Sequence, residues 1–401
     1  MKRLRRGLIA VLFLAVFVPF AGASSLPLPT RLAQALAVPG APAQLSGAVA
    51  VDLLSGRTLF QRNPDKPLAP ASNEKLVVTY TALKELGPSY RFHTSIVSDG
   101  QAATGNWKGD IYLKGFGDPT LTSAGLKRLA LQLKQAGIHR IDGRILGDES
   151  WFDTKRVAEG WKRGFYLNES PPLSALVIDG DVYEHHLALR PALAAAGRFR
   201  QVLRSVGVAS GPVGVGVAPS DASILATVQS RTLVAVIKDM NVHSDNFIAE
   251  EMLKDIGAEA GGAGTTAAGL HVVLADLGAA GVPLAGVRLY DGSGLSLDDR
   301  LTARAIASLL LAMWRDPAMR APVFDSLPVA GESGTLSDRL QFRPARGAVR
   351  AKTGTTDLAT ALSGYVRRQY AFTVLDNGYP VSWNASRRAQ DRFAMTLAKT
   401  P

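Results

Sequence analysis

The spacing of apolar residues changes twice along this 401-residue chain, and these changes constrain its fold more than any other feature. The segment NEKLVVTYTALKEL has apolar residues at helical spacing and ends at Gly87-Pro88. Strand-like alternation around a helical stretch then extends to about residue 225, after which RTLVAVIKDMNVHSDNFIAEEMLKDIG is helical again. We therefore expect one domain built from residues 24–93 and 226–401, interrupted by a smaller inserted α+β domain of residues 94–225.

Strand patterns at the two ends of the mature chain indicate one antiparallel sheet. GAVRAKTGTTDLATALSGYV and YAFTVLDN suit adjacent strands, and SGAVAVDLLSGRTLFQRN is typical of a β-hairpin that can join the same sheet. The helical segments would then lie on the faces of this sheet. The sequence thus predicts an α+β fold.

The N-terminal residues have the three parts of a secretory signal peptide. A basic MKRLRRG precedes apolar LIAVLFLAVFVPF, and Ala21-Gly22-Ala23 supplies the small residues of a cleavage site. We expect cleavage after Ala23, so residues 1–23 are the signal peptide of a periplasmic or extracytoplasmic protein. An uncleaved membrane anchor is the alternative, although the apolar run is shorter than the roughly 20 residues that a span needs.

Composition excludes several classes of function. The chain has no cysteine, which removes disulfides, cysteine proteases, thiol redox chemistry and iron–sulfur clusters. Its formal net charge is +11, and loss of the signal peptide leaves 41 basic against 34 acidic residues, a balance of +7. Because the basic residues are scattered, we expect at most loose contact with a membrane surface or acidic wall polymer, and no nucleic acid.

Three short motifs carry the possible chemistry: Ser72-Asn73-Glu74-Lys75, Ser244-Asp245-Asn246 and Lys352-Thr353-Gly354. Residues i and i+3 share one face of a helix, so the Lys75 amine can lie beside the Ser72 oxygen. A serine hydroxyl needs a neighbouring base to become a nucleophile, and a desolvated lysine can be that base. The first motif therefore predicts an activated serine at a helix N-terminus.

The other two motifs suit substrate binding and proton transfer. Ser244 can relay a proton to a leaving amine, while Asn246 can hold Lys75 or a substrate amide. Lys352-Thr353-Gly354 lies on an expected strand, where glycine admits a substrate backbone. Taken singly, Ser72 could be only an N-cap, Ser244 only a capping residue and Lys352 only an exposed strand lysine. Their occurrence together, in this order and in fitting local structures, favours catalysis at one cleft.

This motif set is typical of serine penicillin-binding proteins and class A β-lactamases. The wider sequence resembles the D-alanyl-D-alanine carboxypeptidase/endopeptidase family, the class C low-molecular-weight penicillin-binding proteins. The similar blocks are PASNEKLVVTYTALKELGPSYRF, GRILGDESWFD, MNVHSDNFIAEEML, YDGSGLS, LPVAGESGTL and AKTGTTDLATALSGYV. The resemblance implies a penicillin-binding-protein/β-lactamase-like transpeptidase domain. It also implies a serine DD-peptidase that acts on peptidoglycan stem peptides, is acylated by β-lactam antibiotics, and needs no metal or organic cofactor.

The resemblance also implies a role for each motif residue. Ser72 would be the acylated nucleophile, Lys75 its base, and Ser244 and Asn246 the second motif. The strand that binds the substrate carboxylate would be Lys352, Thr353, Gly354 and Thr355, with Lys352 and Thr355 recognising the carboxylate. The backbone N–H groups of Ser72 and Thr355 would form the oxyanion hole.

Two features depart from the family pattern. Ser72 and Ser244 are 172 residues apart, so the inserted accessory domain is shorter than usual for the family. Leu297 follows GLS, at a position where members often have a basic residue. The family's account of how the substrate side chain is recognised therefore does not carry over to this chain.

Two alternative functions stay open at this point. One is a serine β-lactamase of the same fold, although the chain lacks the E-x-x-L-N of class A. Tyr166-Leu167-Asn168 matches the class C Y-x-N, 94 residues after Ser72, but that reading leaves the HSDN segment unexplained. The other is an inactive peptidoglycan-binding protein, against which Ser72 and Lys75 argue. His243 is read as structural, and Asp291-Gly292-Ser293-Gly294 as a turn.

Overall fold

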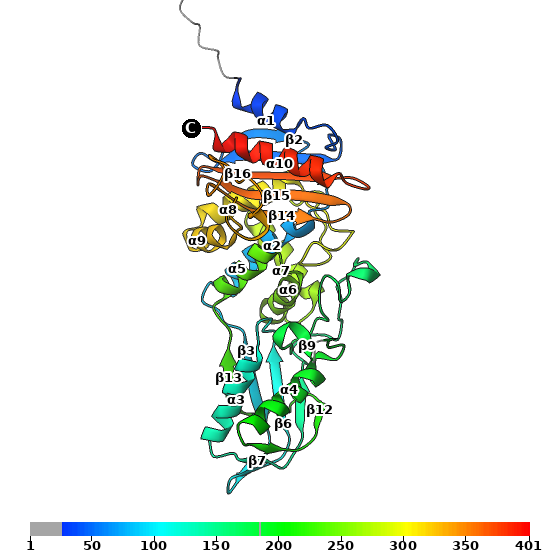
Figure 1. Ribbon diagram of the computed structural model, residues 1–401, viewed down its shortest axis with the longest axis vertical. Coiled ribbons are helices and arrows are strands. Elements are labelled where there is room, and N and C mark those ends of the chain that lie inside the picture. Colours follow the sequence, from blue (N-terminus) through cyan, green and yellow to red (C-terminus); the bar gives the residue numbers. More distant parts are fainter. Residues whose placement is uncertain (1–25, 184–185) are drawn as a thin grey trace, which may run out of the picture.

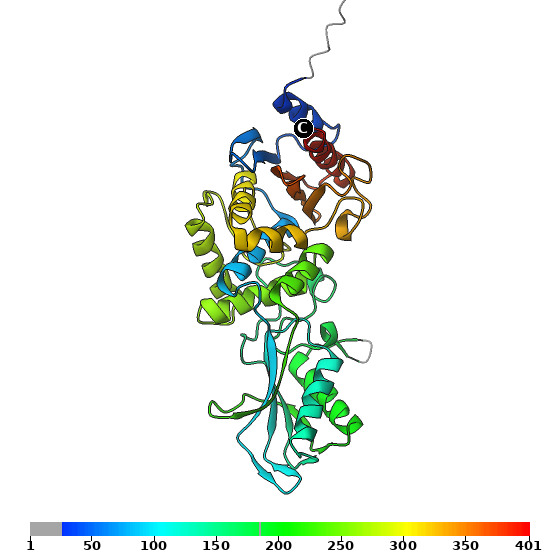
Figure 2. The same cartoon turned by 90° about the vertical axis from the view of Figure 1, so that its left-hand side faces the viewer.

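The computed structural model describes residues 26–183 and 186–401, so the expected signal peptide lies outside the described residues. The described chain forms two lobes joined end to end, as two perpendicular views show (Figures 1 and 2). Helix α1 (Leu28–Leu36) and the C-terminus belong to the upper lobe, while the lower lobe is built from the middle of the sequence (Figure 1). None of the helices in the described ranges combines the length and hydropathy needed to cross a bilayer.

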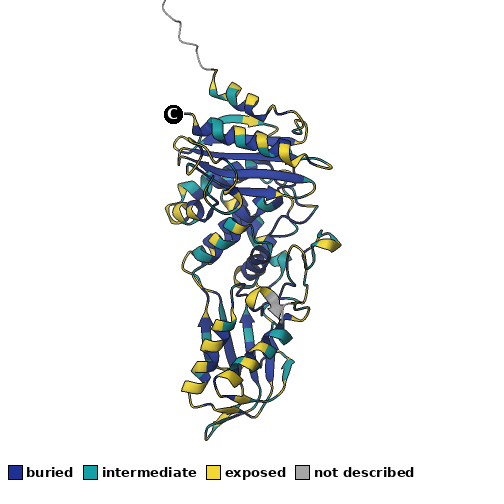
Figure 3. Ribbon diagram, in the orientation of Figure 1, coloured by how far each residue is buried: buried dark blue, intermediate teal, exposed yellow. Residues whose placement is uncertain are grey.

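A five-stranded antiparallel sheet organises the upper lobe and confirms the expected fold class. Its strand order is β14 (Val349–Thr355), β15 (Ala359–Val366), β16 (Tyr370–Asn377), β1 (Ser46–Asp52) and β2 (Thr58–Arg62). The N-terminal hairpin therefore does join the C-terminal strands. The strands are mostly buried (Figure 3).

Both faces of this sheet are covered by helices. On one face, Ala48 and Ala50 of β1 pack in a cluster with α1 (Leu28–Leu36) and α10 (Trp383–Ala398). On the other, Val49 and Val51 pack against α8 (Ala303–Arg315). Because side chains alternate across a strand, a strand between two apolar layers must be apolar throughout. This explains the continuous apolar run of β1.

The first two motifs are carried by a helical layer on the α8 side, whereas the third lies on β14. The further helices of this layer are α2 (Lys75–Glu85), α5 (Leu233–His243), α6 (Asn246–Ala260), α7 (Thr266–Ala279) and α9 (Pro317–Ser326). Helix α2 is buried at every position from Lys75 to Leu83. A helix that is buried all round lies in the middle of its domain. The position of α2 fixes its first residue, Lys75, deep in the lobe.

The lower lobe contains a mixed sheet with helices on one face. The strand order is β12 (Val213–Val215), β8 (Ile145–Asp148), β6 (Ile111–Phe116), β3 (His93–Ser98) and β13 (Ser223–Gln229). Helices α3 (Ser123–Gln135) and α4 (Pro191–Ser205) share an apolar core with it. Residues 94 and 225, where the domain boundaries were expected, lie within β3 and β13. These two strands pair with each other as far as Gln229, so both belong to the lower lobe.

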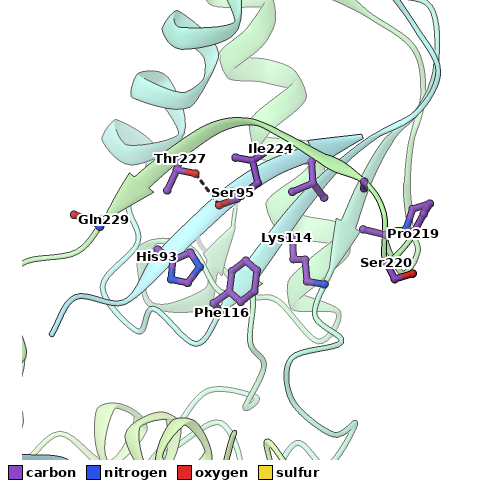
Figure 4. Close-up of a pocket in the computed structure, with 12 residues that line it drawn as sticks. His93, Ser95, Lys114, Phe116, Pro219, Ser220, Ile224, Thr227 and Gln229 are labelled. Carbon is purple, nitrogen blue, oxygen red and sulfur yellow. Dashed lines mark hydrogen bonds between the residues drawn. The ribbon is translucent and has the colours of Figure 1, made fainter. Parts of the chain in front are cut away.

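Smaller elements complete the lower lobe. At its far end, short strands form a four-stranded sheet in the order β11 (Ala209–Ser210), β7 (Arg140–Ile141), β5 (Asn106–Lys108) and β4 (Gln101–Ala103). Strands β9 (Val182–Tyr183) and β10 (His186–Leu187) form a separate pair. A cavity of about 430 Å³ lies beside β3, β6 and β13, where His93 stacks on Phe116 with ring centroids 4.1 Å apart (Figure 4).

Candidate active site

The first motif lies on a tight turn that leads directly into a buried helix. Residues Ala71–Glu74 form a 3₁₀ turn and α2 begins at Lys75, so the helix expected at or beside Ser72 is present. The Nζ atom of Lys75 donates a hydrogen bond to Oγ of Ser72 at 3.1 Å. No side-chain capping bond is made at this turn. The geometry therefore matches a serine and its base rather than an N-cap.

Lys75 is fully buried and its amine has three acceptors. Besides Ser72, Nζ donates to Oδ1 of Asn246 at 2.8 Å and to the carbonyl oxygen of Ser293 at 2.6 Å. Burial lowers the pKa of Lys75 to about 8, although nearby acidic groups, Asp291 first among them, oppose this shift. A substantial fraction of the amine is therefore neutral near pH 8, and it is held against the hydroxyl it would deprotonate.

The Ser293 carbonyl is positioned by buried carboxyl groups. Asp291 accepts hydrogen bonds from the N–H groups of residues 293–296, which closes the turn expected at this segment. Glu250 of α6 accepts from the N–H groups of Gly292 at 3.0 Å and Ser293 at 2.8 Å. These bonds orient the Ser293 carbonyl toward Lys75. Sequence reasoning identified the turn but missed its contact with the lysine.

Glu74, Asp291 and Asp299 bring carboxylate oxygens within 4.8 Å of one another, the arrangement of a candidate metal site. Burial raises the pKa of Asp299 to about 10 and that of Glu74 well above its usual value, with further increases from the neighbouring carboxylates. The charges of Asp291 and Glu74 also act on Lys75, so the cluster takes part in the electrostatics of the site.

The second motif forms the junction between α5 and α6. Helix α5 ends at His243, Ser244 has a left-handed backbone with φ 59°, and Asp245 caps α6 by accepting from the Ile248 N–H at 2.9 Å. This turn places Asn246 at the start of α6, where its Oδ1 accepts from Lys75. Its Nδ2 donates to the carbonyl oxygen of Glu169 at 3.0 Å, which ties the site to the inserted segment.

The third motif lies on β14 at the edge of the sheet. Lys352 is fully buried, so the interpretation as an exposed strand lysine is wrong. Its Nζ donates to Oγ of Ser244 at 2.8 Å and to the Thr353 carbonyl at 3.0 Å. Burial, and then the charge of Lys75, hold the pKa of Lys352 well below its usual value. Ser244 therefore does more than cap a helix.

Gly354 lets β14 approach the serine closely. A Cβ atom at this position would lie 3.1 Å from the Ser72 nitrogen and 3.0 Å from the Pro70 carbonyl oxygen. A hydrogen bond of 3.1 Å from Nδ2 of Asn73 to the Lys352 carbonyl also joins the strand to the serine turn. The glycine thus keeps the Ser72 N–H uncovered, as an oxyanion hole requires.

All three motifs converge on a cavity of about 420 Å³. Its lining includes residues from each motif, namely Ser72, Ser244, Asn246, Thr353, Gly354 and Thr355. Loops and α10 add Glu169, Leu295, Thr335, Asp338, Arg339 and Arg387. Lys75 and Lys352 lie beneath this surface. Sequence reasoning missed Arg387, which no recognised motif contains.

The class C β-lactamase match is not part of this constellation. The Nδ2 atom of Asn168 donates to the carbonyl of Gly164, four residues earlier in an exposed loop, at 2.7 Å. Lys75 is instead bonded to Asn246 of the HSDN segment. His243 is exposed at the end of α5 and does not line the cavity.

A serine–lysine pair at the start of a buried helix, facing the K-T-G edge strand of an antiparallel sheet, defines the class of penicillin-binding proteins and serine β-lactamases. Comparison with known proteins narrows this class. Residues 28–191 and 188–400 match the model of the D-Ala-D-Ala carboxypeptidase 3 (S13) family. The chain belongs to this family, as its sequence blocks predicted, and it is a serine-type D-Ala-D-Ala carboxypeptidase.

Similar proteins cover nearly the whole chain. A D-alanyl-D-alanine carboxypeptidase of Actinomadura sp. (strain R39) is 31% identical over 446 residues, covering 90% of this chain and 82% of that protein. A carboxypeptidase of Mycobacterium tuberculosis is 33% identical over 375 residues, covering 86% and 79%. Penicillin binding protein 4 of Haemophilus influenzae has the same fold, with a TM-score of 0.80, 22% identity, and coverage of 92% and 98%. A second structure of that protein, with a TM-score of 0.74, contains a β-lactam.

Proposed function

We propose that this enzyme hydrolyses the D-Ala-D-Ala end of peptidoglycan stem peptides through an acyl-enzyme on Ser72, and that β-lactams acylate the same oxygen. The observation that carries this proposal is the contact between the buried Lys75 amine and the Ser72 hydroxyl. Family membership supports the reaction, and the β-lactam found in the related Haemophilus structure supports the inhibitor class.

In the acylation step, neutral Lys75 takes the proton of the Ser72 hydroxyl as Oγ bonds to the substrate carbonyl carbon. The oxygen of the tetrahedral intermediate faces the backbone N–H groups of Ser72 and Thr355. The C–N bond then breaks and the departing amine accepts a proton. Ser244 is the donor, because its hydroxyl lies in the cavity and contacts the Lys352 amine. The proton that Lys75 took from Ser72 then replaces the one that Ser244 has lost, so that Lys75 is neutral again and Ser244 is again a hydroxyl. Terminal D-Ala leaves, and the remaining peptide stays esterified to Ser72.

In the deacylation step, water attacks the ester carbonyl and gives one proton to Lys75. The bond between the carbonyl carbon and Oγ breaks, and Oγ recovers a proton from the lysine. The shortened peptide leaves with a new carboxylate. The same two steps cleave a crosslink when the departing amine belongs to a neighbouring stem peptide.

We also propose that the enzyme acts outside the cytoplasm, since its N-terminal residues have the pattern of a cleaved signal peptide. Peptidoglycan lies in that compartment. The balance of +7 in the mature chain permits only loose attraction to acidic polymers or anionic headgroups.

The test is incubation of the purified mature protein first with a fluorescent penicillin and then with muropeptides. We expect stable labelling together with loss of terminal D-Ala, crosslink cleavage, or both. Rapid hydrolysis of the penicillin without peptide cleavage would instead identify a β-lactamase. No reaction with either compound would indicate an inactive wall-binding protein.

A further inference from the structure

The proposed substrate ends in a carboxylate, and this negative charge needs a cation in the cavity. The two motif lysines are poorly placed to supply it. Lys75 and Lys352 are fully buried and their amines are already bonded to oxygen atoms of the protein. Glu169 and Asp338 also line the cavity and would repel an unpaired carboxylate. A positive group other than the lysines is therefore required.

Two arginines line the cavity, and only one of them is available. Arg339 is bonded to Asp391, with Nη2 at 2.7 Å and Nε at 3.1 Å from Oδ1, so its guanidinium is already paired with a carboxylate. Arg387 makes no ion pair within 4.0 Å among the described residues. Its single hydrogen bond within the described structure runs from Nη2 to Oγ1 of Thr355 at 3.2 Å. Its guanidinium is half-buried and has free donors.

Helix α10 holds Arg387 over the end of β14. One turn before it, Nε1 of Trp383 donates to the Thr356 carbonyl at 2.9 Å. One turn after it, Nε2 of Gln390 donates to Oγ1 of Thr360 at 3.0 Å. Residues 383, 387 and 390 share one face of the helix. Anchors on both sides therefore fix this face against the strand that ends at Thr355.

We propose that Arg387, together with Thr355, binds the free carboxylate of the substrate's terminal D-Ala and so sets the preference for a free C-terminus. This inference rests on the proposed function. The guanidinium is planar and presents paired N–H donors, which match the two oxygens of a carboxylate. In the absence of substrate, the Thr355 hydroxyl occupies one of these donors. Lys352 then acts on Ser244 rather than on the carboxylate.

The test compares hydrolysis of a peptide ending in D-Ala-D-Ala with hydrolysis of its C-terminal amide. For Arg387→Ala, we expect kcat/KM on the free acid to fall about ten- to a hundredfold, because a charge-assisted hydrogen bond is lost. The amide should be cleaved as by the wild type. Arg387→Lys should recover part of the preference, since charge returns without the paired donors. Arg388→Ala removes an exposed charge from the same helix and should change neither rate.

Two results would overturn the role of Arg387: an unchanged preference for the free acid in Arg387→Ala, or an equal loss on both peptides, which would indicate structural damage. Failure of the wild type to cleave either peptide, with no acylation by penicillin, would have a different meaning. It would overturn the proposed function, and this inference with it.

Discussion

The Nζ atom of Lys75 lies 2.8 Å from Oδ1 of Asn246, which joins two residues 171 positions apart in the sequence. The contact connects the start of α2 with the start of α6, and so brings the first two motifs into one site. The side chain of Asn246 is a neutral amide. It accepts a hydrogen bond from Lys75 without adding the negative charge that would keep Lys75 protonated.

The pH dependence of acylation should therefore respond to position 246. A general base must be neutral to accept a proton, so the acylation rate of the wild type should rise with pH and level off above about 8, following Lys75. Asn246→Asp introduces a carboxylate beside the amine, which favours the ammonium and should move the midpoint upward by about one pH unit or more. Stopped-flow measurement of the acylation rate between pH 6 and 10 gives the midpoint for each protein. Asn106→Asp, in the far sheet of the lower lobe, is the control, and an unmoved midpoint in Asn246→Asp would contradict the assignment of Lys75.

Gly354→Ala should slow acylation without unfolding the protein. The new methyl group would lie 3.1 Å from the Ser72 nitrogen, where it crowds the N–H that faces the oxyanion. Loss of one such donor costs about 10²- to 10³-fold in rate. Acylation kinetics and thermal unfolding should be measured together. Gly278→Ala, where the added Cβ meets only a side-chain carbon at 3.6 Å, is the matched control. Full activity of Gly354→Ala would exclude this account of the glycine.

Ser244 and Lys352 should behave as one unit. If the hydroxyl gives its proton to the leaving amine and the lysine supports that transfer, either Ser244→Ala or Lys352→Met should lower kcat by about 10²- to 10⁴-fold. The double variant should be hardly worse than the slower single variant, because groups that act together give non-additive losses. The double-mutant cycle requires steady-state hydrolysis of one D-Ala-D-Ala peptide by the wild type, the two single variants and the double variant. Losses that multiply would mean that the two side chains act separately.

Glu250 should be important mainly for stability. Glu250→Ala leaves the buried N–H group of Gly292 without its acceptor and that of Ser293 with Asp291 alone, at a cost of about 1–3 kcal/mol in the free energy of unfolding. Burial raises the pKa of Glu250 to about 8, and Glu250→Gln keeps an acceptor oxygen in place, so it should cost much less. Urea denaturation distinguishes the two variants. Equal losses of unfolding free energy in Glu250→Ala and Glu250→Gln would show that the charge of Glu250, rather than its acceptor oxygen, stabilises the loop that contains Gly292 and Ser293.

The sequence predicts the parts of this fold that follow a regular apolar pattern. Strand β1 and the helix expected at or beside Ser72 are both found, the helix with a 3₁₀ turn at Ala71–Glu74 and its α-helical part from Lys75, because burial imposes the apolar pattern of both elements. The inserted domain is also present, but its edge strand β13 extends beyond the expected boundary. Its alternation SILATVQ includes exposed apolar positions, such as Ile224, and therefore gives a weak signal.

The site was predictable where a motif fixes both residue type and local structure. Ser72, Lys75, Ser244, Asn246 and the K-T-G strand are brought together as the motifs indicated, although their catalytic roles stay predictions. Contacts made by the backbone, such as the Ser293 carbonyl on Lys75, leave no mark on residue type. Arg387 enters the cavity only because α10 packs across β14 and β15, a tertiary relationship that local sequence does not encode.

The most direct test of the central claim is to identify the residue that carries the acyl group. Wild-type protein and Ser72→Ala should be incubated with penicillin and analysed by mass spectrometry, first intact and then as peptides. We predict that the wild type gains one penicillin mass on the peptide containing Ser72. The variant should gain none, while its unfolding temperature stays within about 2 °C of the wild type. Acylation of the variant, or of any residue other than Ser72 in the wild type, would contradict the account.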